Sequence, residues 1–425
     1  MKYLILGNGP TGVVAAEALR AADPAGEIVM AGSEKEPPYS RMAIPYLLAS
    51  NIDERGTYLR KSDDHYDKLN IKQRQGRAVS LDCGKREVLF QDGQKESFDK
   101  LLIATGSHPI RPPIPGIDLP QVQTCWTLED SRAIAGLAKP GSRVVQLGAG
   151  FIGSIIMEAL HARKVELTVV EKGDRMVPRM MTPVAGGMIK SWCEAKGIRV
   201  ITSAGIERID AARPGGEVTV TLSTGEKIPA DLVIVSAGVA PNVGFLDGTP
   251  VKAASGVLVN ERMETSVPGI YAAGDVAEAP DLFTGAHLVA AIQPNAADQA
   301  RIAALNMAGQ KTRLPGVLAI NVLDSMGLIS SSFGQWWGDK SEDGVELVDS
   351  DGYRYLSLQF KDDVLIGATS LGLTDHVGML RGLIQNRTKL GPWKEKLKHD
   401  PLRFPEAYIA CTQSPTIMVH SLHLH

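Results

Sequence analysis

The stretch KYLILGNGPTGVVAAEAL, residues 2–19, decides the fold of the N-terminal part of this chain. Its apolar run YLIL is typical of a buried parallel strand, GNGPTG of a tight turn, and the small residues that follow of a helix. Gly7 permits the tight turn, Gly9 lets a phosphate approach the backbone, and Gly12 allows close packing of the helix. Free amides at the start of that helix attract an anion. The stretch therefore predicts a strand–turn–helix unit that binds the pyrophosphate of a dinucleotide.

A second unit of the same kind occupies residues 143–171. RVVQLG predicts a strand, Gly148, Gly150 and Gly153 repeat the glycine spacing, and ELTVVE predicts a strand that ends at Glu171. A carboxylate at this place accepts hydrogen bonds from the adenine ribose of NAD and repels the 2′-phosphate of NADP, so it indicates NAD(H). The alternative, that Glu171 only ends a strand, stays open. In the first unit, EIVMAGSE likewise predicts a strand that ends near Glu34. Two such units predict a protein that binds two nucleotides and transfers electrons between them.

Composition limits the class of protein. A chain of 425 residues with 44% hydrophobic and 22% charged residues predicts a globular protein of two or three domains. A net charge of −3 provides no basic field for nucleic acid, and no run of eighteen apolar residues suggests a membrane span. Nothing before the first strand suggests a cleavable signal, and four scattered cysteines form no disulfide framework. We therefore expect a cytoplasmic protein with no membrane span and no nucleic-acid partner.

Three further stretches complete a family pattern. KLLIATGSHP (100–109) predicts a strand running into Thr105 and Gly106, VIVSAGVAPN follows at 233–242, and GIYAAGDVAEAP (269–280) predicts a strand running into Gly274 and Asp275. In this order, and together with the two glycine turns, these stretches resemble the FAD-dependent pyridine nucleotide-disulfide oxidoreductase family over residues 1–310. The resemblance implies an α/β fold with two Rossmann-like dinucleotide-binding domains. It places a discontinuous FAD domain at residues 1–110 and 251–310, an inserted NAD(H) domain at 111–250, and a small α+β C-terminal interface domain at 311–425.

The resemblance also assigns cofactor-binding residues, while it assigns no catalytic side chain and no metal ligand, because hydride passes from NADH to the flavin itself. The residues assigned to FAD are Gly7, Gly9, Pro10, Thr11, Gly12, Glu34, Lys35, Arg41, Pro45, Val79, Ala104, Thr105, Gly106, Gly274, Asp275, Gln293, Pro294 and Asn295. The residues assigned to NAD(H) are Gly148, Gly150, Phe151, Ile152, Gly153, Glu171, Lys172, Ala237 and Gly238.

A helix near residue 295 has a predicted role beside the flavin. In IQPNAADQARIAALNMAG (292–309), Pro294 suits the first helical position, so a helix is expected to begin near Asn295. By resemblance its positive end faces the pyrimidine edge of the flavin, where it would stabilise the reduced anion. The alternative is an ordinary surface helix.

The stretch PPYSRMAIPYLLAS (37–50) departs from many family members. Met42 stands where a single redox-active cysteine is expected, and a thioether cannot become a thiolate or a mixed disulfide. This disfavours thiol–disulfide and cysteine-based peroxide chemistry. PPYSR instead resembles the PPYxR of ferredoxin, rubredoxin and nitrite reductase flavoproteins, which implies that Arg41 lies by the FAD; a surface salt bridge is the alternative. Ile155 replaces the glutamate usual on the NAD helix.

The C-terminal part carries three further patterns. Trp336 and Trp337 suit either an interface or a sheet core. Residues 387–403 hold six Lys or Arg, which suit either a docking strip for an acidic redox partner or a solvated helix face. Residues 408–425 contain no Asp, Glu, Lys or Arg, and we expect this tail to dock on a partner subunit, with packing on its own domain as the alternative.

These observations predict an FAD-dependent NAD(H) oxidoreductase that exchanges electrons, in either direction, with a one-electron acceptor. That acceptor is expected to be an iron-sulfur protein or subunit, as for ferredoxin or rubredoxin reductases or the flavoprotein subunit of a tungsten aldehyde oxidoreductase-type complex. The chain would act as a homodimer or as a subunit of a hetero-oligomer. Two alternatives stay open: a redox-sensing flavoprotein resembling apoptosis-inducing factor, and a CoA-disulfide reductase or NADH oxidase using another sulfur.

Overall fold

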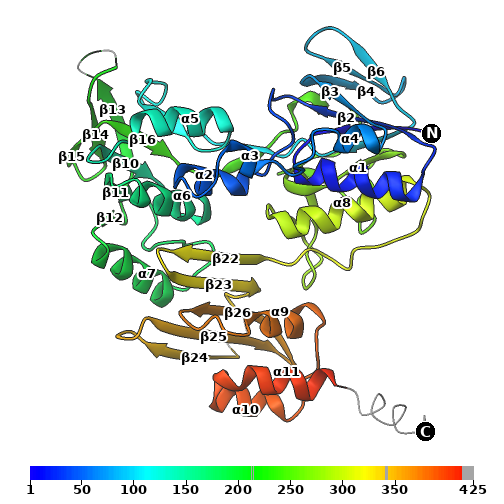
Figure 1. Ribbon diagram of the computed structural model, residues 1–425. Helices are drawn as coiled ribbons and strands as arrows, with labels where there is room; N and C mark the ends of the chain where they lie inside the picture. Colours follow the sequence, from blue (N-terminus) through cyan, green and yellow to red (C-terminus); the bar gives the residue numbers. More distant parts are fainter. Residues whose placement is uncertain (212, 214, 340–342, 414–425) are drawn as a thin grey trace. The chain divides into compact units, whose positions relative to one another are not determined.

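The computed structural model describes residues 1–211, 213, 215–339 and 343–413, which fall into two compact units (Figure 1). Unit 1 consists of Met1–Pro112, Thr124–Gly136 and Ala237–Val317. Unit 2 consists of Pro113–Gln123, Leu137–Ser236 and Leu318–His425. Residues 124–136 thus belong to unit 1, although the boundaries expected from the sequence place them in the NAD(H) domain.

Unit 1 is built on a five-stranded parallel sheet in the order β19-β7-β1-β2-β3. The residues of β1 after Lys2 are buried, as expected for a central parallel strand covered on both faces. Helix α1 follows β1 directly and packs beside α8. The strands and these two helices are β1 Lys2–Leu6, β2 Glu27–Gly32, β3 Ile71–Gln75, β7 Lys100–Ile103, β19 Ile270–Ala272, α1 Pro10–Ala22 and α8 Gln293–Met307.

Smaller elements of unit 1 surround this sheet. Three short antiparallel groups pair β4-β5-β6, β17-β8 and β20-β21, and β18 adds to β20 in parallel. The strands are β4 Ala78–Asp82, β5 Glu87–Phe90, β6 Lys95–Ser97, β8 Ser107–Pro109, β17 Val239–Pro241, β18 Val257–Leu258, β20 Ala277–Pro280 and β21 His287–Val289. The helices are η1 Arg41–Ala43, α2 Ile44–Leu48, α3 Glu54–Thr57, α4 His65–Lys68, α5 Leu128–Leu137, η2 Gly244–Leu246 and η3 Gly274–Val276.

Unit 2 contains a second five-stranded sheet in the order β12-β11-β10-β16-β9, in which β12, β11, β10 and β16 pair in parallel. Helix α6 follows β10 as α1 follows β1, so the same strand–turn–helix unit occurs twice in the chain. An antiparallel sheet, β13-β14-β15, accompanies it. The elements are β9 Val122–Thr124, β10 Arg143–Leu147, α6 Phe151–Ala162, β11 Glu166–Val170, α7 Pro183–Ala195, β12 Arg199–Ile201, β13 Ile206–Ala211, β14 Val218–Leu222, β15 Lys227–Ala230 and β16 Leu232–Val235.

The C-terminal part of unit 2 is an antiparallel sheet, β22-β23-β26-β25-β24, with helices after it. Thr182 at the start of α7 donates a hydrogen bond to the Tyr355 hydroxyl (2.9 Å), and the Trp192 indole donates to the carbonyl of Ser325 (2.9 Å). These contacts attach the sheet to α7. Its elements are β22 Ile320–Ser325, β23 Leu328–Gly334, β24 Gly344–Asp349, β25 Arg354–Lys361, β26 Val364–Leu371, α9 Val377–Gln385, α10 Trp393–His399, η4 Pro401–Arg403 and α11 Phe404–Thr412. The predicted α/β class with two Rossmann-like parallel sheets is confirmed.

Candidate functional site

The first glycine turn, residues 7–12, uses its three glycines in two different ways. Gly7 has φ +120°, and a Cβ there would lie 2.0 Å from the carbonyl oxygen of Ala104. A Cβ on Gly12 would lie 1.9 Å from the carbonyl oxygen of Gly7. A Cβ on Gly9, by contrast, meets no described atom within 4 Å. Packing therefore requires Gly7 and Gly12, whereas Gly9 keeps open space beside the start of α1.

The second glycine turn, residues 148–153, repeats this construction in unit 2. Gly148 has φ +98°, and its Cβ would lie 2.4 Å from the Ser236 carbonyl oxygen; that of Gly153 would lie 2.3 Å from the Gly148 carbonyl oxygen. Around Gly150 no described atom lies within 4 Å of a Cβ. Among the described side chains none caps the start of α1 or of α6. Each turn thus pairs uncapped helix amides with open space, which fits a pyrophosphate.

The two predicted ribose-binding carboxylates lie just beyond β2 and β11. Both oxygens of Glu171 accept backbone N–H groups, from Ala149 and from Gly173, each at 2.7 Å. Glu171 is therefore anchored to the second glycine turn. Glu34 accepts the Tyr39 hydroxyl (2.6 Å) and pairs with Arg41 (2.5 Å), so two predicted FAD residues are in direct contact.

Arg41 is part of a connected polar group in unit 1. Its guanidinium donates to the carbonyl oxygen of Trp126 (2.6 Å) and lies 5.3 Å from the centre of that residue's ring. The Trp126 indole N–H donates to the Ser107 carbonyl oxygen (3.0 Å), and the Ser107 hydroxyl donates to Asp275 (3.2 Å). Arg41 is therefore held in place by Trp126 and is linked to Asp275 through this chain of hydrogen bonds.

Asp275 lies in η3, directly after the Gly274 turn. Burial raises the pKa of its carboxyl group, while the Ser107 hydroxyl and the charge of Arg41 oppose that rise. Gly274 has φ +80°, and a Cβ there would lie 2.3 Å from the Thr11 hydroxyl of the first glycine turn. The two predicted FAD segments therefore meet. A largely desolvated carboxyl beside an open pyrophosphate site suits the hydroxyl groups of a sugar chain.

Asn242 holds the segment Ala104–Gly106 in place. Its side-chain amide donates to the Thr105 carbonyl oxygen (2.8 Å), and its backbone N–H donates to the Gly106 carbonyl oxygen (2.9 Å). The Thr105 hydroxyl donates in return to the Asn242 carbonyl oxygen (2.9 Å). Since Ala104 also abuts Gly7, this segment forms one wall of the first glycine turn.

The remaining predicted residues take no part in the contacts described above. Helix α8 begins at Gln293, two residues before the expected Asn295, with Pro294 in its first turn; Gln293 accepts a hydrogen bond from Ser40 (3.0 Å). Pro45 lies at the start of α2 and is half-buried. Exposed members of the predicted set are Lys35, Val79, Lys172, Ala237, Gln293 and Pro294. Ala237 and Gly238 belong to unit 1, whereas the second glycine turn belongs to unit 2.

Met42 occupies the position at which many family members have a redox-active cysteine. Met42 lies in η1 next to Arg41, with a side chain that is 45% exposed. The four cysteines are free, and burial raises the pKa of the Cys125 and Cys193 thiols to about 12. Both behave as small buried hydrophobic residues rather than as nucleophiles.

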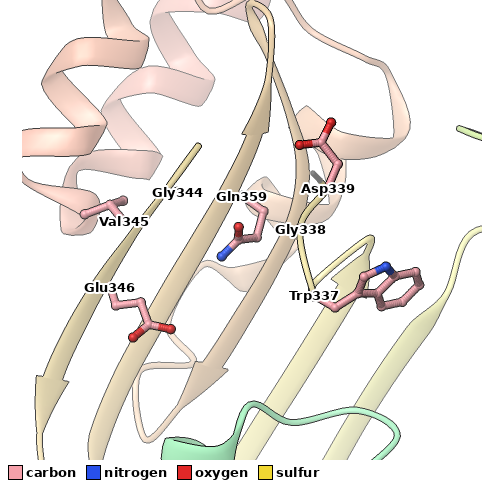
Figure 2. A pocket seen from close by; sticks show the side chains of 7 residues that line it. All are labelled: Trp337, Gly338, Asp339, Gly344, Val345, Glu346 and Gln359. Carbon is pink, nitrogen blue, oxygen red and sulfur yellow. The ribbon is translucent and has the colours of Figure 1, made fainter. Parts of the chain in front are cut away.

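A cavity of about 280 Å³ lies in the C-terminal sheet and contains none of the predicted cofactor residues (Figure 2). Gln359 lies between Gly338 and Gly344, whose Cβ atoms would each approach its amide oxygen to 2.7 Å. Trp337 at the rim is 63% exposed, whereas Trp336 is buried and belongs to the sheet core. The lining residues are Trp337, Gly338, Asp339, Gly344, Val345, Glu346 and Gln359.

Three of the six basic residues in the strip at 387–403 form ion pairs within the protein. Lys394 and Lys398 both form ion pairs with Asp343, and Arg403 pairs with Glu406. These pairs favour the interpretation of a solvated face over that of a docking strip. Of the uncharged tail, residues 414–425 lie outside the described residues.

Sequence reasoning missed several residues that support the site. No sequence motif identifies Trp126, because its contacts join segments that are far apart in the chain. Asn242 stood inside the quoted stretch VIVSAGVAPN but received no role. Gln146 is a polar residue in the apolar run RVVQLG, which was a visible signal.

Comparisons with known proteins place this geometry in a family. The family model described as pyridine nucleotide-disulphide oxidoreductase matches residues 1–291. The chain belongs to this family. It is 30% identical over 405 residues to NADH-dependent phenylglyoxylate dehydrogenase subunit epsilon of Aromatoleum evansii, covering 94% of this chain and 95% of that relative.

Two further relatives match over nearly their whole length. The ferredoxin–NAD(+) reductase component of the biphenyl dioxygenase system of Paraburkholderia xenovorans is 31% identical, with coverage of 91% of this chain and 93% of the relative. The crystal structure of the ferredoxin reductase for the CYP199A2 system from Rhodopseudomonas palustris superposes with a TM-score of 0.86 at 27% identity, covering 96% of this chain and 99% of that one.

Family membership confirms the prediction of an oxidoreductase that uses FAD and NAD(H). It also confirms the resemblance drawn from the glycine turns and the strand-end stretches. Within the described part of the chain, no helix has the length and apolar character needed to cross a membrane.

Proposed function

We propose that this protein transfers electrons between NADH, bound at the second glycine turn, and a one-electron iron-sulfur carrier, through FAD bound at the first. The proposal rests on one observation that occurs in both glycine turns. The middle glycine of each turn, Gly9 or Gly150, leaves open space beside the uncapped amides at the start of a helix. Bound FAD would supply the redox chemistry, since a flavin accepts a hydride and releases electrons singly.

The chain's own residues bind and orient the two nucleotides. The amides at the starts of α1 and α6 would hold the two pyrophosphates. Asp275 would bond the flavin's sugar chain, and Arg41, held by Trp126, would place a fixed positive charge beside the FAD. Glu171, anchored by the second glycine turn, would receive the adenine ribose of NADH and disfavour NADPH.

The absence of a redox-active cysteine at position 42 favours an acceptor that takes electrons directly from the flavin. Met42 cannot relay electrons through a disulfide, and the two buried cysteines hold their thiols protonated. Electrons would therefore leave the flavin directly. Similarity to a ferredoxin–NAD(+) reductase component and to a dehydrogenase subunit supports an iron-sulfur protein or subunit as the acceptor, and supports a role for this chain in a larger assembly.

Anaerobic mixing of the NADH-reduced holoenzyme with competing acceptors tests the proposal. We expect oxidised [2Fe–2S] ferredoxin to reoxidise the flavin at least tenfold faster than coenzyme A disulfide, a difference of ~1.4 kcal/mol. The variant Met42→Leu is the matched control and should transfer electrons at the wild-type rate, because the thioether takes no part in redox chemistry. Faster reaction with coenzyme A disulfide would indicate a disulfide reductase. A stable complex of reduced flavin with NAD+ and no transfer to any acceptor would indicate a sensor.

A further inference from the structure

Gln146 is a polar residue at the centre of the second parallel sheet. It lies in β10 two residues before Gly148, and its side chain is fully buried. Its amide nitrogen donates to the carbonyl oxygens of Gly148 and Gly153, both at 2.9 Å. In the first glycine turn the corresponding position, two residues before Gly7, is occupied by Ile5. The two turns therefore have similar backbone geometry, but at this position only the second turn has a buried polar side chain that bonds its carbonyl oxygens.

The orientation of the Gln146 amide is determined by its partners. Carbonyl oxygens only accept hydrogen bonds, so the NH₂ group must face the two glycine carbonyls. The amide oxygen then points away from them, and among the described residues it has no hydrogen-bond partner. A buried carbonyl oxygen without a partner destabilises the fold, whereas Ile5 shows that an apolar residue fills this position. The unpartnered amide oxygen therefore offsets part of the stability that the two donated hydrogen bonds provide.

The hydrogen bonds of Gln146 lead directly to Glu171. The peptide group between Gly148 and Ala149 is planar, so its carbonyl and its N–H are oriented together. Gln146 holds the carbonyl at one side, and the Ala149 N–H donates to Glu171 at the other (2.7 Å). Gln146 thereby fixes the peptide plane that orients the Glu171 carboxylate, although it contacts neither Glu171 nor any position open to a nucleotide.

We propose that Gln146 is a positioning residue for nucleotide selection: through the Gly148–Ala149 peptide it holds Glu171 in the orientation that accepts a ribose 2′-hydroxyl and rejects a 2′-phosphate. This inference rests on the proposed binding of NADH at the second glycine turn. An apolar residue at position 146 removes the two hydrogen bonds to the Gly148 and Gly153 carbonyl oxygens, so the Gly148–Ala149 peptide is less firmly oriented and the Ala149 N–H is a weaker anchor for the carboxylate.

Titration calorimetry of the FAD-loaded protein tests this role with ADP-ribose and 2′-phospho-ADP-ribose, which contain the discriminating ribose and lack nicotinamide. The wild-type protein should bind ADP-ribose at least tenfold more tightly. In Gln146→Met, which keeps the side-chain volume without the donor, and in Gln146→Val, this preference should fall at least threefold while FAD content stays unchanged. If Gln146→Val does not fold, Gln146→Met still decides the outcome.

Gln121 provides the matched control within unit 2. It is also buried, it also donates its amide N–H to a glycine carbonyl (Gly216, 2.5 Å), and its amide oxygen also lacks a partner among the described residues. Gln121→Leu should therefore change stability comparably and leave the ADP-ribose preference intact. An unchanged preference in the position-146 variants would overturn the inference while leaving the proposed function standing. Absence of any preference in the wild-type protein would overturn the role of Glu171 and this inference together.

Discussion

Replacing Gly150 with alanine separates the fold of unit 2 from nucleotide binding. Gly150 has φ −72°, which alanine adopts without strain, and the added methyl group meets no described atom within 4 Å. Because alanine restricts the unfolded chain more than glycine does, the free energy of unfolding should stay the same or rise by about 0.4–1 kcal/mol. The folded protein should therefore tolerate Gly150→Ala.

Nucleotide binding should respond in the opposite direction. The new methyl group projects into the space beside the start of α6, where a pyrophosphate would approach the free amides. Loss of one hydrogen bond to a charged group costs about 1.5–3 kcal/mol. This corresponds to binding of NAD+ that is about 10- to 150-fold weaker.

Calorimetric titration of the FAD-loaded Gly150→Ala protein with NAD+ measures this loss, and the flavin absorbance of the purified protein measures retained FAD. Gly153→Ala is the contrasting control, since its Cβ would lie 2.3 Å from the Gly148 carbonyl oxygen and should impair folding. Wild-type affinity for NAD+ in Gly150→Ala would refute the assigned pyrophosphate site. Loss of FAD in this variant would show that the two nucleotides have been assigned to the wrong turns.

Three other predictions concern the carboxylates and Met42. Glu171→Ala should lower the ratio of NADH to NADPH efficiency in stopped-flow flavin reduction at least tenfold, or ~1.4 kcal/mol, and an unchanged ratio would remove Glu171 from selection. Anaerobic titration should consume two electrons per FAD with no thiolate-to-flavin charge-transfer band, because Met42 replaces the cysteine; uptake of four electrons would reveal a disulfide. Burial raises the pKa of Asp275, so the folded FAD-free protein holds that proton more tightly than the unfolded chain, and the contribution of Asp275 to the free energy of unfolding should fall as the pH rises above about 4. The thermal stability of the wild type relative to Asp275→Asn should therefore decline with rising pH while the variant loses FAD affinity, and a stability difference that does not change with pH would contradict the pKa assignment.

Local constraints explain why the glycine turns were predictable from the sequence. Positive φ at Gly7 and Gly148, and the close approach of Gly12 and Gly153 to the preceding turn, each restrict the residue type to glycine. These constraints act within a few residues, so their spacing is visible in a single chain. The replacement of a cysteine by Met42 was equally visible, because it needs only the resemblance of the surrounding stretch.

Contacts between distant segments were not predictable in the same way. Arg41 is held by Trp126, more than eighty residues away, and the segment that carries Trp126 belongs to unit 1 although both flanking segments belong to unit 2. No periodicity or composition marks such an arrangement. Asn242 meets Thr105 for the same reason, through pairing of β17 with β8. The start of α8 differs by two residues because proline is tolerated throughout the first helical turn, where no N–H partner is needed.

In the proposed function, the flavin receives two electrons as one hydride from NADH and releases them singly without a thiol. Anaerobic mixing of the cysteine-alkylated holoenzyme with limiting NADH and an excess of oxidised [2Fe–2S] ferredoxin tests this route. A hydride carries two electrons, so two ferredoxin molecules should be reduced for each NADH oxidised, at a rate that alkylation does not change. Oxidation of NADH without ferredoxin reduction, or loss of electron transfer on alkylation, would contradict it.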